Sequence, residues 1–222
     1  MRRLLTLFAL LCGIGGLAVT PELSPAAGAQ PVPPVSAAAR AVGFIDVRAA
    51  VPDALIDLRY ATPNNFVGVP LYPQGARCLV HESLAQGLAV AAAQLRAQGL
   101  RLVFWDCYRP HDVQVRMFEV VSNPAWVARP GDYSKSHESG RSVDVTTYGA
   151  TGLTDMGTDF DSFTPDALAY ATAGVSQAAQ HNRAVLRAAM AAGGLSVYDG
   201  EWWHFDGPGA GAPRPIINVP LG

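Results

Sequence analysis

Two short motifs constrain this chain more than any other feature, because together they supply the side chains of a catalytic metal site. Two imidazoles and one carboxylate can bind a zinc ion and leave a position open for water, while a further carboxylate serves as a base. The motifs are residues 136–144 and 201–204, and the candidate side chains are those of His137, Asp144, Glu201 and His204. The fold must therefore bring two distant segments together.

The spacing within each motif leaves the local geometry partly open. Gly140 lies between His137 and Asp144 and allows a tight turn through which both side chains reach one ion. Glu201 and His204 are three positions apart, and residues at this spacing in a strand point to opposite faces. Either a bulge or bend turns both side chains inward, or Glu201 precedes the strand, where the backbone is less constrained.

The N-terminal segment has the pattern of a secretory signal peptide. Arginines precede an apolar run over residues 4–19, and Ala-Gly-Ala at residues 27–29 is a small-x-small cleavage pattern. The run is shorter than the roughly 20 residues that span a bilayer, which favours cleavage over a retained anchor. We predict a signal peptide over residues 1–29 and an exported protein, periplasmic or secreted, without stable membrane insertion after cleavage.

The remaining chain is consistent with one domain. Residues 30–41, rich in Pro and Ala, predict a flexible lead-in, and residues 42–222 predict a single domain with an ample core. The formal net charge is −2, and Lys135 is the only lysine. Because no basic patch is present, we expect no nucleic-acid partner. The oligomeric state is not determined by the sequence.

Two cysteines, Cys78 and Cys107, lie outside the N-terminal segment. In an oxidising compartment they can form a disulfide, and the alternative is a pair of buried free thiols. The sequence leaves these two interpretations open. Neither cysteine has the C-x-x-C spacing typical of a zinc ligand.

The pattern of apolar residues predicts an α+β fold. Pro110 is expected at the first position of its helix, where proline is favoured. The predicted helices cover residues 81–98, 110–121 and 177–192, and the predicted strands cover residues 100–108, 142–148 and 201–206. Because these elements do not alternate regularly, we expect a central, mostly antiparallel sheet with flanking helices.

Five motifs resemble, in the same order, those of the D-alanyl-D-alanine dipeptidases, a family within the wider group of zinc D,D-peptidases. They extend from residue 57 to residue 204 and comprise residues 57–62 with 65–66, 105–110, 136–144, 156–161 and 201–204. One such motif alone is weak evidence, whereas five in order are specific. The resemblance implies a zinc D,D-peptidase-like fold that hydrolyses the D-Ala-D-Ala dipeptide to two D-alanines.

The resemblance also implies roles for the metal-site residues. His137, Asp144 and His204 are the implied ligands of one Zn²⁺ per chain, and Glu201 is the implied general base. Chemistry supports these roles, because zinc lowers the pKa of a bound water to about 7 and a nearby carboxylate can take its proton and pass it to the leaving amine.

The same resemblance implies the groups that bind the substrate. Arg109 is expected to stabilise the oxyanion. Apart from the resemblance, we hypothesise that nearby Asp106 holds the Arg109 guanidinium from behind. Tyr60 and Asp161 are implied to bind the free amine of the dipeptide, and Ser136 its carboxylate. A buried Asp161 would favour a free amine over an acylated one, whereas the alternative is a residue of a surface turn.

The predicted export bears on the biological role and leaves alternatives. An exported enzyme cannot reach D-Ala-D-Ala in the cytoplasm, where it is made, so we expect a role in wall turnover or alanine scavenging. One alternative is a D,D-carboxypeptidase acting on longer peptidoglycan peptides. Another is a non-hydrolytic, zinc-stabilised wall-binding module, which would need neither Glu201 nor Arg109. A purely structural zinc site usually has four ligands rich in cysteine.

Overall fold

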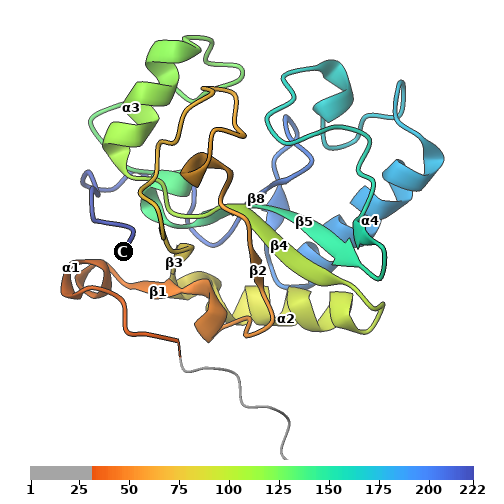
Figure 1. Ribbon diagram of the computed structural model, residues 1–222, viewed down its shortest axis with the longest axis horizontal. Helices are drawn as coiled ribbons and strands as arrows, with labels where there is room; N and C mark the ends of the chain where they lie inside the picture. Colours follow the sequence, from red (N-terminus) through yellow and green to blue (C-terminus); the bar gives the residue numbers. More distant parts are fainter. Residues whose placement is uncertain (1–31) are drawn as a thin grey trace, which may run out of the picture. The chain divides into compact units, whose positions relative to one another are not determined.

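The computed structural model describes residues 32–222, which form two β-sheets with surrounding helices (Figure 1). The smaller sheet pairs β1 (Phe44–Asp46) with β3 (Leu79–His81). The larger sheet has six strands in the order β2-β4-β5-β8-β7, with β6 paired to β5. Its strands are β2 (Leu55–Ile56), β4 (Arg101–Asp106), β5 (Ser142–Gly149), β6 (Gly152–Leu153), β7 (Ser196–Val197) and β8 (His204–Asp206). The signal peptide predicted for residues 1–29 lies outside the described residues.

The larger sheet confirms the α+β prediction. Its β2–β4 pair is parallel, and its other pairs are antiparallel. The register between β4 and β5 shifts between Phe104 and Asp106, so that Asp106 lies opposite Asp144. Asp144 in turn lies opposite His204 on β8. The pairing therefore brings the two sequence motifs together at one end of three adjacent strands.

Within residues 32–222, four α-helices and several short 3₁₀ segments surround the sheets. In Figure 1, α3 lies at the top and α2 at the bottom. The α-helices are α1 (Ala37–Ala41), α2 (Ala85–Arg96), α3 (His111–Val120) and α4 (Gln177–Ala192). The 3₁₀ segments are η1 (Val47–Ala49), η2 (Arg59–Ala61), η3 (Glu82–Leu84), η4 (Ser136–Ser139) and η5 (Pro165–Ala167).

The apolar faces of α2 and α4 build one part of the core. In α2, Leu88, Ala91, Ala92 and Leu95 are buried at the spacing of one helical face. The helix α4 begins after Ser176, whose side chain accepts a hydrogen bond from the Ala179 amide. The two helices pack closely, because a Cβ on Gly87 would lie 2.3 Å from the carbonyl oxygen of Gly193.

Four local predictions differ from the structure. The helix predicted over residues 81–98 is shorter, because residue 81 ends β3, residues 82–84 form η3, and α2 covers Ala85–Arg96. Pro110 is the N-cap of α3 and not its first helical residue. Residues 201–203 form a turn, so that the last strand is confined to β8. Part of the lead-in that we expected to be flexible is helical, since residues 37–41 form α1. Here the Ser36 side chain caps the helix and Ala39 is fully buried.

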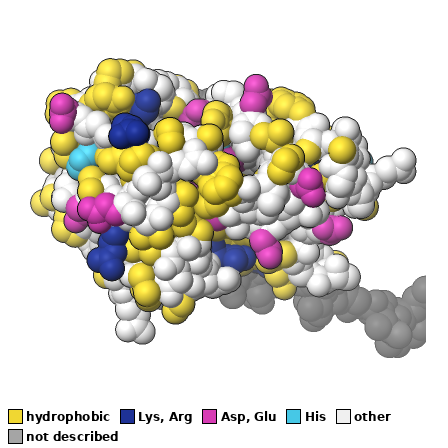
Figure 2. All heavy atoms as spheres, turned by 90° about the horizontal axis from the view of Figure 1, so that it is seen from above, with side chains coloured by type: hydrophobic (Ala, Val, Ile, Leu, Met, Phe, Trp, Pro, Cys, Tyr) yellow, Lys and Arg dark blue, Asp and Glu magenta, His cyan; other side chains and the backbone are white. Residues whose placement is uncertain are grey.

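The described surface is mixed in charge. Figure 2 shows a face on which Lys and Arg side chains are scattered among acidic and hydrophobic ones. Among residues 32–222, no helix has the length and apolar character that crossing a membrane requires.

Candidate active site

The three predicted metal ligands converge at the end of the larger sheet. His137 lies in η4, Asp144 in β5 and His204 at the start of β8. His137 Nε2 lies 3.2 Å from Asp144 Oδ1 and 3.0 Å from His204 Nδ1, and the latter atom lies 3.1 Å from Asp144 Oδ1. A tetrahedral zinc ion with bonds of about 2.0–2.1 Å separates its ligand atoms by about 3.3 Å. The triangle therefore fits three ligands of such an ion.

Hydrogen bonds at the outer nitrogens of both imidazoles support this arrangement. His137 Nδ1 lies 2.8 Å from the Cys107 carbonyl oxygen, to which it donates, so that Nε2 carries the free lone pair. His204 Nε2 lies 3.0 Å from Asp206 Oδ1, which leaves Nδ1 to face the metal position. Carbonyl and carboxylate partners of this kind are typical of metal-binding histidines.

Opposite charges and hydrogen bonds within this cluster shift the pKa values of Asp144 and His204. Burial would raise the pKa of Asp144, but His137 and His204 outweigh burial and hold it well below its usual value. Burial lowers the pKa of His204, but hydrogen bonds to Asp144 and Asp206 raise it to about 10. Without a metal ion, His204 therefore carries a proton at neutral pH, and a bound metal ion would replace the positive charge of that proton.

Glu201 lies beside the cluster, in the turn before β8. One of its carboxylate oxygens is 3.9 Å from His204 Nδ1. The turn resolves the geometry that the sequence left open, because Glu201 precedes the strand and both side chains face the same cavity. Burial is the main reason that the pKa of Glu201 rises to about 7. A carboxylate with this pKa suits proton transfer near neutral pH.

Arg109 approaches the cluster from the end of β4. Its Nε and Nη2 lie 3.0 and 2.7 Å from Asp106 Oδ2, and its Nη1 lies 2.7 Å from Gln114 Oε1. Its Nη2 is also 4.0 Å from Asp144 Oδ2. Burial would lower the pKa of Arg109, but Asp106 outweighs burial and keeps the guanidinium charged. The cation is therefore fixed on several sides.

Tyr60 and Asp161 also line the cavity, and the Tyr60 ring centre lies 5.2 Å from the Arg109 guanidinium carbon. The Tyr60 hydroxyl donates a 2.9 Å hydrogen bond to Asp161 Oδ2, although the two residues are far apart in sequence. Burial, together with the nearby charge of Asp144, raises the pKa of Asp161 well above its usual value. A cation placed beside Asp161 would restore its ionised form.

Ser136 lies at the edge of the metal cluster. Its hydroxyl donates to Ser142 Oγ at 3.0 Å, and Ser142 donates in turn to Asp206 Oδ1 at 2.5 Å. Ser136 and Asp161 are the two described non-glycine residues with positive φ, at 49° and 54°. This conformation costs an ordinary residue roughly 1–2 kcal/mol, and such strain often marks functional positions.

All the predicted site residues line one cavity of about 300 Å³. This volume is at the lower end of the range for small-molecule pockets, about 300–1,000 Å³. The set brought together is Tyr60, Arg109, Ser136, His137, Asp144, Asp161, Glu201 and His204. The described structure therefore assembles every candidate in one place, and it joins Cys78 and Cys107 in a disulfide.

Several supporting residues escaped the sequence analysis. Asp206 follows His204 by two positions in β8, and strand alternation places both on one face, which is a signal that was available. Gln114 and the Cys107 carbonyl had no such signal, because their contacts with Arg109 and His137 depend on how separate elements pack.

Together, the fold and the cavity define a metal-dependent peptidase. A family model described as D-ala-D-ala dipeptidase matches residues 40–221. The chain therefore belongs to the D-Ala-D-Ala dipeptidase family and is a metallopeptidase.

Individual relatives agree with this assignment. The D-alanyl-D-alanine dipeptidase of Escherichia coli K12 is 35% identical over 175 residues, which cover 78% of this chain and 89% of the relative. The D-alanyl-D-alanine dipeptidase of Enterococcus faecalis V583 is 30% identical, covering 67% of this chain and 83% of the relative. The dipeptidase of the same name from Streptomyces coelicolor is 31% identical with the same coverage.

Proposed function

We propose that this protein hydrolyses the free dipeptide D-Ala-D-Ala to two D-alanines with one zinc ion at His137, Asp144 and His204. The observation that carries the proposal is the convergence of these ligands with Glu201 and Arg109 in one cavity. When bound, zinc supplies Lewis acidity and lowers the pKa of water.

The side chains around the metal position divide the remaining chemistry. Glu201 accepts a proton from the attacking water and returns it to the amine of the departing D-alanine. Arg109, held by Asp106 and Gln114, meets the negative charge that develops on the carbonyl oxygen. Because these partners fix the guanidinium beforehand, little reorganisation is needed during the reaction.

Three further residues of the cavity, Tyr60, Ser136 and Asp161, are suited to the termini of a dipeptide. Asp161, whose half-buried carboxylate needs a cation, binds the free ammonium with the help of Tyr60. An acylated amine carries no charge and would leave the Asp161 carboxylate unpaired. Ser136 binds the substrate carboxylate when its hydroxyl turns away from Ser142, to which it donates in the described structure.

An aromatic cluster beside Tyr60 supports a short substrate over longer wall peptides. Phe66, Trp126 and Phe163 line the cavity and come from three separate loops. Trp126 and Phe163 stack with ring centres 5.1 Å apart, and Phe66 lies edge-on to both Phe163 and Tyr60. A substrate extended beyond its amine would have to displace this cluster, which disfavours the alternative of a D,D-carboxypeptidase.

The variant Trp126→Ala tests this exclusion. We expect the parent to cleave L-Ala-D-Ala-D-Ala far more slowly than D-Ala-D-Ala. In the variant, the ratio of kcat/KM for the dipeptide to kcat/KM for the tripeptide should fall at least tenfold. Trp126→Phe is the matched control and should keep the gap, because it keeps an aromatic ring. An unchanged gap in the alanine variant would show that the cluster does not set substrate length.

We further propose that the protein acts outside the cytoplasm, in wall turnover or alanine scavenging. The pattern of residues 1–29 supports export, and the Cys78–Cys107 disulfide fits an oxidising compartment. The dispersed charges fit a small substrate and no nucleic-acid partner. Expression of the full chain in a host with D-Ala-D-Ala precursors should give no glycopeptide resistance, and resistance would contradict an exported role.

Removal and return of metal test the zinc assignment. Prolonged treatment with a chelator should abolish D-alanine release, and one equivalent of zinc should restore it. Activity that survives complete metal removal, verified by elemental analysis, would rule out the metal mechanism.

A further inference from the structure

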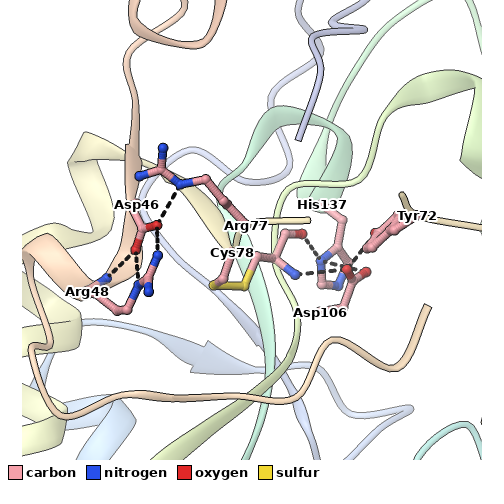
Figure 3. The surroundings of a disulfide bond; sticks show 8 residues. Asp46, Arg48, Tyr72, Arg77, Cys78, Asp106 and His137 are labelled. Carbon is pink, nitrogen blue, oxygen red and sulfur yellow. Dashed lines mark hydrogen bonds and ion pairs between the residues drawn. A yellow bond between two sulfur atoms is a disulfide. The ribbon is translucent and has the colours of Figure 1, made fainter. Parts of the chain in front are cut away.

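The Cys78–Cys107 disulfide lies directly behind the metal cluster. The amide of Cys107 donates to Asp106 Oδ1 at 2.9 Å, and its carbonyl oxygen accepts the 2.8 Å hydrogen bond from His137 Nδ1 (Figure 3). One cysteine therefore contacts both the partner of Arg109 and a metal ligand through its backbone.

The surrounding bonds extend this link to Arg109. The amide of Arg109 donates to the His137 carbonyl oxygen at 3.1 Å, while its guanidinium is held by Asp106. Tyr72 donates to the remaining oxygen of Asp106 at 2.6 Å. The backbone at Cys107 thus lies between the group that holds the metal and the group that meets the oxyanion.

The backbone at Cys107 lies outside the ladder of β4 and β5, and the next amide, that of Tyr108, donates to the Leu79 carbonyl of β3 at 2.8 Å. Cys107 follows the last residue of β4, just beyond the shift in register between β4 and β5. By contrast, the Cys78 carbonyl accepts from the Val47 amide at 2.9 Å, next to the pairing of β1 with β3. Neighbouring Arg77 is fixed by Asp46 at 2.9 Å. The disulfide therefore adds a covalent link to the smaller sheet beside the hydrogen bond from Tyr108 to Leu79.

We propose that the Cys78–Cys107 disulfide is a positioning element of the metal centre. It holds the Cys107 carbonyl where His137 must donate from Nδ1, which leaves Nε2 for the metal, and it keeps Arg109 aligned with the same point. The inference rests on the proposed function in that it requires a metal at this site. Both cysteines are 1% exposed, so the disulfide is built into the core and is not a surface staple.

The test compares Cys78→Ala/Cys107→Ala with Leu186→Ala. Leu186 is fully buried in α4, and no residue of α4 lines the cavity. Leu186→Ala should therefore destabilise the fold, as the double-cysteine variant should, without removing a residue of the site. For each folded protein, the thermal midpoint, the zinc dissociation constant by chelator competition, and kcat and KM on D-Ala-D-Ala are measured.

We expect the double-cysteine variant to bind zinc about 10- to 100-fold more weakly, the usual effect of losing support behind a metal-binding histidine. Its kcat should fall while KM stays within threefold, because Tyr60 and Asp161 lie on other segments. Leu186→Ala should lower the thermal midpoint but keep zinc affinity within threefold. Parent-like zinc affinity in the double variant, or an equal loss in Leu186→Ala, would overturn the inference.

Two further outcomes are distinguished by the design. If the parent itself binds no zinc or releases no D-alanine, the proposed function fails, whatever the cysteine variants show. If the double variant does not fold, the parent is reduced with a phosphine until two thiols are counted, under conditions that preserve its circular dichroism. Loss of zinc affinity on reduction then supports the inference, and retention overturns it.

Discussion

At the scale of single residues, the outer hydrogen bond of each imidazole decides which nitrogen faces the metal position. His137 donates from Nδ1 to Cys107, and His204 donates from Nε2 to Asp206, so that opposite ring nitrogens face one point. The sequence indicates both histidines, but it does not indicate which nitrogen of His137 faces the metal, because the Cys107 carbonyl belongs to a segment that is distant in sequence.

Glu201→Gln separates proton transfer from metal binding. The amide keeps the shape of the carboxylate but cannot accept the proton of water, so kcat should fall by about 10²–10⁴-fold. Zinc affinity, measured by chelator competition, should stay within a few-fold, because Glu201 is not among the three ligands. A variant that keeps more than a tenth of the parent kcat would show that another group acts as the base.

The affinity for zinc should depend on pH through His204. The pKa of His204 is raised from 6.5 to about 10 in the metal-free protein, so its imidazole is protonated at pH 7 and must lose that proton when metal binds. Affinity should therefore rise about tenfold per pH unit from pH 6 to pH 9. Competition titrations at several pH values measure this slope. The rise in zinc affinity should end near the pKa of His204, and Asp206→Asn should lower the pH at which it ends, because the hydrogen bond from His204 to Asp206 helps to raise that pKa. A flat profile would contradict the proton displacement.

At the scale of elements, α4 positions the loop that carries Asp161. Arg183 is 1% exposed and donates from Nε to the Met156 carbonyl at 2.7 Å, and from Nη1 to the Asp166 and Leu168 carbonyls at 2.9 and 3.2 Å. A buried guanidinium with three carbonyl partners fixes both ends of the segment around Asp161.

Removing this guanidinium should weaken substrate binding and spare the metal. We expect Arg183→Met to raise KM for D-Ala-D-Ala at least tenfold and to leave zinc affinity within threefold. Arg187→Met is the matched control, because Arg187 lies on the same helix and donates to one carbonyl, that of Ala169. If KM in the Arg183 variant is unchanged, the loop is held by other contacts.

The elements that the sequence predicted well have clear apolar periodicity. The helix predicted over residues 177–192 and the strand predicted over residues 142–148 match α4 and β5 closely. The strand predicted over residues 201–206 is partly wrong, because tertiary contacts outweigh local propensity. The Trp202 amide donates to the Ala167 carbonyl and its indole to Thr158, which holds this segment in a turn.

At the scale of the whole molecule, the site depends on contacts between segments that are distant in sequence. The motifs identified its candidate residues, because each chemical role requires a particular side chain. The sequence could not decide between a disulfide and free thiols for Cys78 and Cys107, since that depends on whether the start of β3 lies beside the end of β4. Their Cα atoms are 5.3 Å apart in the fold.

The most direct test of the central claim is D-alanine release by the purified protein from D-Ala-D-Ala and, in parallel, from N-acetyl-D-Ala-D-Ala, with Glu201→Ala as the inactive control. The account predicts chelator-sensitive cleavage of the free dipeptide, abolished by the substitution, and no cleavage of the acetylated substrate, because acetylation removes the charge that Asp161 binds. Equal cleavage of both substrates would contradict the amine pocket and point to a carboxypeptidase, and cleavage of neither by the zinc-bound protein would contradict the dipeptidase function itself.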